Sequence, residues 1–122
     1  MGLLGCLFGC SQSPALKAGA IYSVEDGEGA YRVAKILVLD EQGVHVRLFK
    51  NTWNERPAQI EISELSLGSV HDGEDVGLGH LPLTKKAFAA WRPILVQSGT
   101  VAKDELDGYE MWKEGGGGYF DE

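Results

Sequence analysis

Three apolar segments follow one another between residues 20 and 53, and only short turns separate them. They are AIYSVED (residues 20–26), AYRVAKILVLD (30–40) and VHVRLFKNTW (44–53). All three are rich in β-branched and aromatic residues, and both intervening turns contain glycine. Strands joined by short glycine-containing turns pair antiparallel with their neighbours. The sequence therefore predicts an antiparallel meander at the centre of a mainly β (α+β) fold.

The third segment alternates, so its side chains divide between two faces. Val44, Val46 and Leu48 share one face, which we expect to be the inner one. The other row is mixed: it contains His45, Arg47, Phe49, Asn51 and Trp53. Such a row is either a ligand-binding surface or a second buried face. We expect it to be covered mostly by the helices of the chain itself, with Trp53 at its edge.

The second half of the chain carries weaker signals. Residues 59–63 (QIEIS) favour a short fourth strand with Ile60 and Ile62 on one side, and the Gly- and Asp-rich residues 68–83 are typical of a loop. Residues 84–91 predict a helix capped by Thr84, 94–97 a strand and 103–113 a second helix. We expect one globular domain over residues 16–122, with barrel strands at about 18–67 and a helical addition at about 82–114.

Composition limits the classes of function. The chain has 122 residues and a net charge of −7, which suits one small acidic domain and argues against general nucleic-acid binding. Arg32 and Lys35 fall on opposite faces of their strand, as do Arg47 and Lys50, so they form no basic stripe. The only cysteines, Cys6 and Cys10, provide no disulfide framework.

Residues 1–15 form an apolar, uncharged segment that we expect to be either flexible or lipid-anchored. Cys10 follows Leu-Phe-Gly in a pattern similar to a bacterial lipobox, and Cys6 follows Leu-Leu-Gly in the same way. Gly2 is a candidate for myristoylation. The segment is too short to span a membrane. We expect a cytoplasmic protein, or a membrane-anchored lipoprotein if the start is a truncated signal peptide.

Residues 18–53 resemble the first strands of a small SH3-like barrel of the Tudor kind. The matching features are Gly19, Tyr22, the Asp26-Gly27 turn, the Tyr31–Ala34 strand and the run from Phe49 to Asn54. The resemblance implies a small antiparallel barrel, on which two short C-terminal helices would pack. It also implies a cage of aromatic side chains that holds a methylated cation. The implied ligand-binding residues are Tyr22, Tyr31, Phe49 and Trp53, with Arg47 beside them.

One cluster in the predicted loop has the residue types of a metal or acid–base site: His71, Asp72, Glu74, Asp75 and His80. The alternative is a solvated acidic loop in which His80 bonds the backbone. No catalytic or nucleotide-binding motif is present, and we expect no cofactor. The sequence favours a non-enzymatic protein-interaction or accessory module with a protein partner. The alternatives are a small metal-binding protein or enzyme that uses the His71–His80 loop, and a Tudor-like reader of peptide or nucleic acid.

Overall fold

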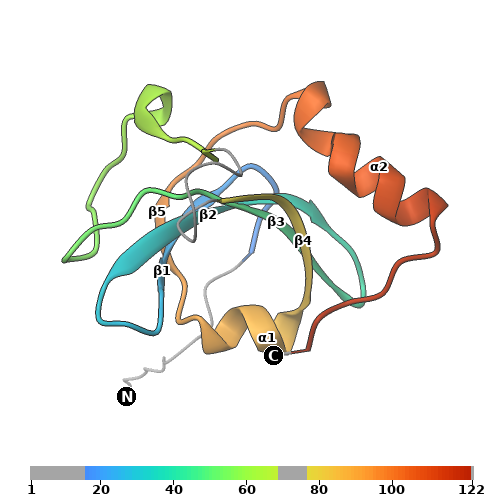
Figure 1. Ribbon diagram of the computed structural model, residues 1–122, viewed down its shortest axis with the longest axis horizontal. Coiled ribbons are helices and arrows are strands. Elements are labelled where there is room, and N and C mark those ends of the chain that lie inside the picture. The colour runs from blue at the N-terminus through green and yellow to red at the C-terminus, as the bar shows by residue number, and fades with distance from the viewer. Residues whose placement is uncertain (1–15, 69–76, 122) are drawn as a thin grey trace, which may run out of the picture.

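The computed structural model describes residues 16–68 and 77–121, which fold around one antiparallel sheet (Figure 1). Its strands are β1 (Ile21–Glu25), β2 (Tyr31–Leu39), β3 (Gly43–Leu48), β4 (Leu78–Thr84) and β5 (Ile94–Gln97). Their order is β4-β3-β2-β1-β5, so β5 returns beside β1. The predicted meander and the mainly β fold class are confirmed. The sheet is not closed into a barrel, because β4 and β5 lie at its opposite edges.

The first hairpin shows why these short turns form. Asp26 accepts hydrogen bonds from the backbone amides of Glu28 (2.7 Å) and Ala30 (3.1 Å). Gly27 and Gly29 have φ angles of 85° and 88°, a region that suits glycine. The aspartate therefore closes the turn while the glycines allow the chain to reverse.

Both faces of the sheet are covered, but by different parts of the chain. One face carries Tyr22, Ile36, Val44 and Val46 and packs against Phe88 of α1 (Lys85–Ala90). The opposite face holds a second cluster of Ile21, Val33, Phe49 and Ile60, against which Trp53, Leu65, Leu67 and Val96 pack. The prediction that Val44 and Val46 point into a core is confirmed.

The helices take opposite sides of the sheet. Figure 1 shows α1 below the sheet and α2 (Asp107–Glu114) above it. Thr84 caps α1 as predicted, because its side chain accepts the amide hydrogen bond of Ala87 at 3.1 Å. The second predicted helix begins as a 3₁₀ turn, Lys103–Leu106, and continues as α2. The expectation that the helices cover the mixed row of the third strand is wrong for α1, because Phe88 and the adjacent Trp91 pack on the other face of the sheet.

Two further predictions for the second half are wrong. Residues 59–63 are not a strand: Ile60 is buried, Ile62 is 54% exposed, and a 3₁₀ turn spans Ile62–Glu64. Residues 78–83 are not a loop, because they belong to β4. This strand contains Pro82, which cannot donate a backbone hydrogen bond, yet an edge strand tolerates proline. Pro82 still uses its carbonyl, which accepts the amide of Phe120 at 2.9 Å.

Candidate functional site

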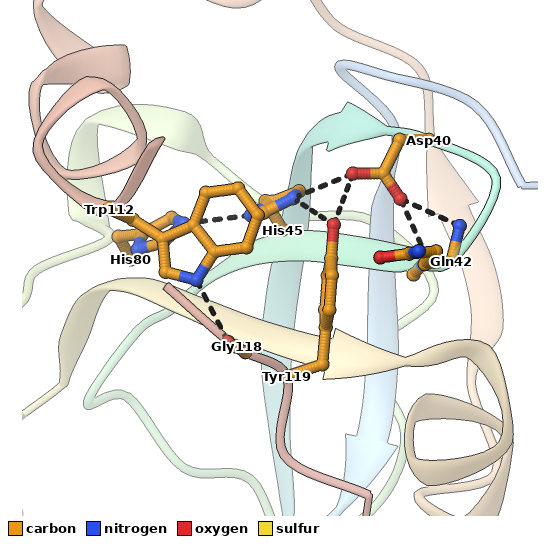
Figure 2. Close-up of polar contacts among 8 residues, drawn as sticks. Asp40, Gln42, His45, His80, Trp112, Gly118 and Tyr119 are labelled. Atoms are coloured by element: carbon orange, nitrogen blue, oxygen red, sulfur yellow. Dashed lines mark hydrogen bonds and ion pairs between the residues drawn. The ribbon is translucent and has the colours of Figure 1, made fainter. Parts of the chain in front are cut away.

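Two histidines from neighbouring strands are in direct contact on the face below α2 (Figure 2). His45 lies on β3 and His80 on β4, which pair antiparallel. His45 Nδ1 and His80 Nε2 are 2.9 Å apart, and the two rings stack with 14° between their planes. His45 is 0% exposed. Its hydrogen bonds must therefore be made within the protein.

The turn between β2 and β3 supplies a carboxylate to His45. Asp40 Oδ1 accepts hydrogen bonds from the backbone amides of Gln42 (2.9 Å) and Gly43 (2.8 Å). Asp40 Oδ2 lies 3.2 Å from His45 Nε2. One carboxylate therefore both closes a turn and meets the buried histidine. The turn bonds are local, because both amides lie within three residues of Asp40.

Tyr119, near the C-terminus, completes the network and assigns its protons. Its hydroxyl donates to Asp40 Oδ2 and lies 3.0 Å from His45 Nε2. Because the tyrosine proton points at Asp40, His45 Nε2 carries a hydrogen and His45 Nδ1 is an acceptor. His80 Nε2 then donates to His45 Nδ1. Among the described residues, every buried side-chain nitrogen and oxygen has a partner.

The second helix, α2, covers the histidine pair with aromatic rings. The centres of the Tyr109 and Trp112 rings lie 4.8 Å and 4.5 Å from that of His45, both in edge-to-face geometry. Trp112 Nε1 donates a 2.8 Å hydrogen bond to the carbonyl of Gly118, which joins the helix to the C-terminal segment. A Cβ atom at Gly108 would lie 2.6 Å from His80 Cβ. The helix can approach His80 this closely only because residue 108 is glycine.

Gly108→Ala tests this contact. Alanine in a helix interior normally stabilises by about 1 kcal/mol relative to glycine. Here we expect a net loss of about 1–2 kcal/mol in the free energy of unfolding, because the new methyl group forces α2 away from His80. Urea denaturation measures the change, and Glu110→Ala, exposed on the same helix, is the control. A stabilised Gly108→Ala protein would contradict the close approach.

Burial keeps both histidines neutral at neutral pH. It lowers the pKa of His45 against the opposing effect of Asp40. Burial and the neighbouring His45 lower the pKa of His80 to about 4. Burial alone would raise the pKa of Asp40, but hydrogen bonds from Tyr119, Gly43 and His45 lower it to about 2. Burial and the Asp40 carboxylate raise the pKa of Tyr119. The network therefore holds one carboxylate, two neutral imidazoles and a neutral phenol.

This hydrogen-bond network connects distant parts of the fold. A carboxylate followed by imidazoles could orient a general base, but a substrate must be able to touch that base. His45 has no exposed surface, and His80 uses Nε2 to donate to His45. The contacts connect the β2–β3 turn, β4, α2 and the C-terminal segment. We interpret the network as the point where these four parts are held together.

The aromatic residues predicted as a cage do not converge. Tyr22 is 0% exposed and packs edge-to-face on Phe88, whereas Phe49 belongs to the cluster on the opposite face. Trp53 is half-buried and forms an isolated bridge with Tyr31. The Tyr31 ring already has the Arg56 guanidinium 4.8 Å from its centre. The side chain that completes the predicted set, Arg47, donates to the Gly79 carbonyl at 3.3 Å and lies 3.8 Å from Glu105.

The remaining predicted residues divide between strand β4 and parts outside the described residues. His80 belongs to β4 and not to a loop, as shown above. His71, Asp72, Glu74 and Asp75 lie outside the described residues, as do Gly2, Cys6 and Cys10. Within residues 16–68 and 77–121, no group of three or more His, Cys, Asp or Glu side chains is placed to hold a metal ion. No helix in these ranges has the length and apolar character needed to cross a bilayer.

A pocket of about 180 Å³ lies beside the first hairpin, away from the histidines. Val24 and Trp91 contribute apolar walls, and Glu25 contributes a carboxylate. That carboxylate is 3.6 Å from Arg56 and 3.6 Å from Arg92. The charge of Glu25 is therefore already balanced by the arginines of the chain itself.

The two edges of the sheet differ. At the β4 edge, the amide of Thr84 donates to the carbonyl of Phe120 at 2.8 Å, and the amide of Phe120 donates to Pro82. The C-terminal segment thus pairs with β4. At the other edge, the only strand of the described chain that pairs with β5 is β1. Ile94 and Leu95 on β5 are 53% and 50% exposed.

Of the four residues in the network, only His80 was predicted from the sequence as a site residue. His45 was recognised only as part of a mixed row, although a lone histidine between two core valines is a signal for a buried partner. The only sequence signal at Asp40 is its local Asp-x-x-Gly turn, and Tyr119 has no such signal. At a significant level, the chain matches no protein-family model, no curated protein and no solved structure.

Proposed function

We propose that this chain is a non-enzymatic protein-interaction module that binds an extended segment of a partner protein along β5. The observation that carries the proposal is the outer edge of that strand, with which no strand of the described residues pairs. An edge strand presents a row of backbone donors and acceptors, and an added strand satisfies them. Main-chain hydrogen bonds then give affinity, while neighbouring side chains give specificity.

The β5 edge lacks the charged side chains with which many proteins protect an edge. Edge strands are usually guarded by charged side chains, by proline or by irregular pairing. Residues 94–101 (ILVQSGTV) contain no charged side chain. Pro93 precedes the strand, and the pairing register shifts once, between Ile21 and Tyr22 of β1. Ile94 and Leu95 are about half exposed and offer apolar contacts to an added strand.

We also propose that the scaffold is an open relative of the SH3-like small barrel. The segment that resembles such barrels, residues 18–53, spans β1, β2 and β3, which are consecutive neighbours in the sheet. The return of β5 to β1 supports this relationship. We do not propose a Tudor-like cage, because Tyr22 is in the core and Tyr31 already contacts Arg56.

A random ten-residue peptide library displayed on phage tests the proposed function. We expect the full chain to select peptides rich in aliphatic and β-branched residues, and Leu95→Lys to weaken their binding at least tenfold. The lysine places a charge at the edge, at a position that is 50% exposed and belongs to neither core cluster. Fluorescence polarisation of the selected peptides measures the affinity.

Met111→Lys is the matched control, because Met111 is 73% exposed and lies on α2, away from β5. It should bind the same peptides as the unsubstituted chain. If no peptide is selected, or if Leu95→Lys and Met111→Lys bind equally well, the β5 proposal fails.

A further inference from the structure

The opposite edge of the sheet is already paired with residues 119–121 of the chain itself. Leu83 and Phe120 form an isolated parallel bridge. The amide of Phe120 donates to Pro82 at 2.9 Å, and the carbonyl of Phe120 accepts from Thr84 at 2.8 Å. These bonds are those of a short added strand. The edge of β4 is therefore able to accept an extended segment.

The two residues beside Phe120 anchor the segment through their side chains. Tyr119 reaches inward, where its hydroxyl donates to Asp40 and lies 3.0 Å from His45 Nε2. Asp121 Oδ1 accepts a 2.6 Å hydrogen bond from the Thr84 hydroxyl. Phe120 itself is 60% exposed. Recognition thus rests on a tyrosine, on one residue bound through its backbone, and on an acid.

The site fits a tyrosine closely. A Cβ atom at Gly43 would lie 2.6 Å from the Tyr119 ring and 2.3 Å from the Leu83 carbonyl oxygen. A phenylalanine in place of Tyr119 would leave Asp40 and His45 without the hydroxyl that lies between them. Asp40 and His45 would still bond each other, so the preference for tyrosine comes from the lost hydrogen bond between the hydroxyl and the Asp40 carboxylate.

The link between this segment and α2 consists of glycine. Residues 115–118 are four successive glycines, all exposed. Glycine loses more conformational freedom on ordering than any other residue, so the link opposes docking of the segment. The docked state depends on the contacts of residues 118–121, and each such hydrogen bond contributes about 1 kcal/mol. A segment of the same chemistry from another chain can compete for these contacts.

We propose that the edge of β4 is a binding site for an extended tyrosine–apolar–acidic segment of another protein, and that residues 119–121 are its tethered competitor. This site is separate from the proposed β5 edge. The partner strand would pair with Pro82 and Thr84, place its tyrosine hydroxyl against Asp40, and direct its acid to Thr84. A flexible tether gives the resident segment an effective concentration in the millimolar range, so binding in trans is masked in the unaltered chain.

The test adds the peptide acetyl-Gly-Gly-Tyr-Phe-Asp-Glu to the full ¹⁵N-labelled chain. In Tyr119→Ala, whose own segment is weakened, the peptide should shift the amide signals of Gly43, Leu83 and Thr84. Its affinity there should be at least tenfold higher than for the unsubstituted chain. The same peptide with alanine in place of its tyrosine should bind neither protein.

Gly117→Ala provides a second route if Tyr119→Ala does not fold. Its Cβ atom would lie 2.2 Å from Trp112 Cδ1, so it should displace the segment while every recognition residue remains. Gly118→Ala is the control, since its Cβ atom would have nothing within 4 Å. The proposal is overturned if neither displaced variant binds the peptide better than the unsubstituted chain does. It is also overturned if light scattering shows dimers that the peptide does not dissociate, which would assign this edge to a second copy.

Discussion

His45→Ala will lower the free energy of unfolding by about 3 kcal/mol. The His45 ring is 0% exposed and lies in contact with the rings of Tyr109 and Trp112. Its removal leaves a cavity, and it also leaves Asp40 and His80 without their shared partner. Truncation of a large core side chain costs about 2–5 kcal/mol, and an unsatisfied buried polar group adds to that cost.

Urea denaturation at pH 7.5 measures this loss. Met111→Ala is the control, because Met111 lies on α2 with Tyr109 and Trp112 but is 73% exposed. This substitution should change the free energy of unfolding by no more than about 0.5 kcal/mol. The indole N–H signal of Trp112 should also move in His45→Ala, since the Trp112 ring packs edge-to-face on the His45 ring. Equal stability of the two variants would show that the histidine pair does not hold α2 to the sheet.

Local signals made the first three strands predictable. Apolar segments of the right length alternate with turns whose residues enforce reversal, such as Asp26 with Gly27 and Gly29. The cap at Thr84 was predictable for the same reason, because its partner Ala87 is three residues away. Strand β4 was missed because Gly77, Gly79 and Pro82 are typical of loops. Pairing with β3 on one side and Phe120 on the other overrides that local preference.

Most of the histidine network could not be predicted, because every contact in it except the one between Asp40 and His45 joins distant parts of the chain. His45 and His80 are 35 residues apart, and His45 and Tyr119 are 74 apart. The first contact requires β4 to exist as a strand, and the second requires the C-terminal segment to fold back along it. The row that contains His45 is covered as expected, but by α2 at one end and by residues 60–67 at the other.

Acidification from pH 7 to pH 5 will destabilise the fold by about 2 kcal/mol. The pKa of His80 falls from its ordinary value of 6.5 to about 4 on folding, because of burial and the adjacent His45. Between these values the unfolded chain binds a proton at His80 that the folded chain does not bind. The contribution of neutral His80 to the free energy of unfolding is therefore complete above pH 6.5 and is lost as the pH falls toward 4. Urea denaturation at intervals of half a pH unit measures the slope.

His80→Gln isolates the contribution of this histidine, since the glutamine amide can still donate to His45 Nδ1 but does not titrate. Its stability should fall less steeply between pH 7 and pH 5 than that of the unsubstituted chain; parallel slopes would exclude His80 as the source. Below pH 4 a second loss of stability should follow in both proteins. Folding lowers the pKa of Asp40 from 3.8 to about 2, so between these values the unfolded chain binds a proton at Asp40 that the folded chain does not bind. Since α2 and Tyr119 meet the sheet at these groups, the Trp112 indole signal should respond to acid before the amide signals of β1 and β2 do. A simultaneous change in all of these signals would instead mean that acid unfolds the domain as one unit.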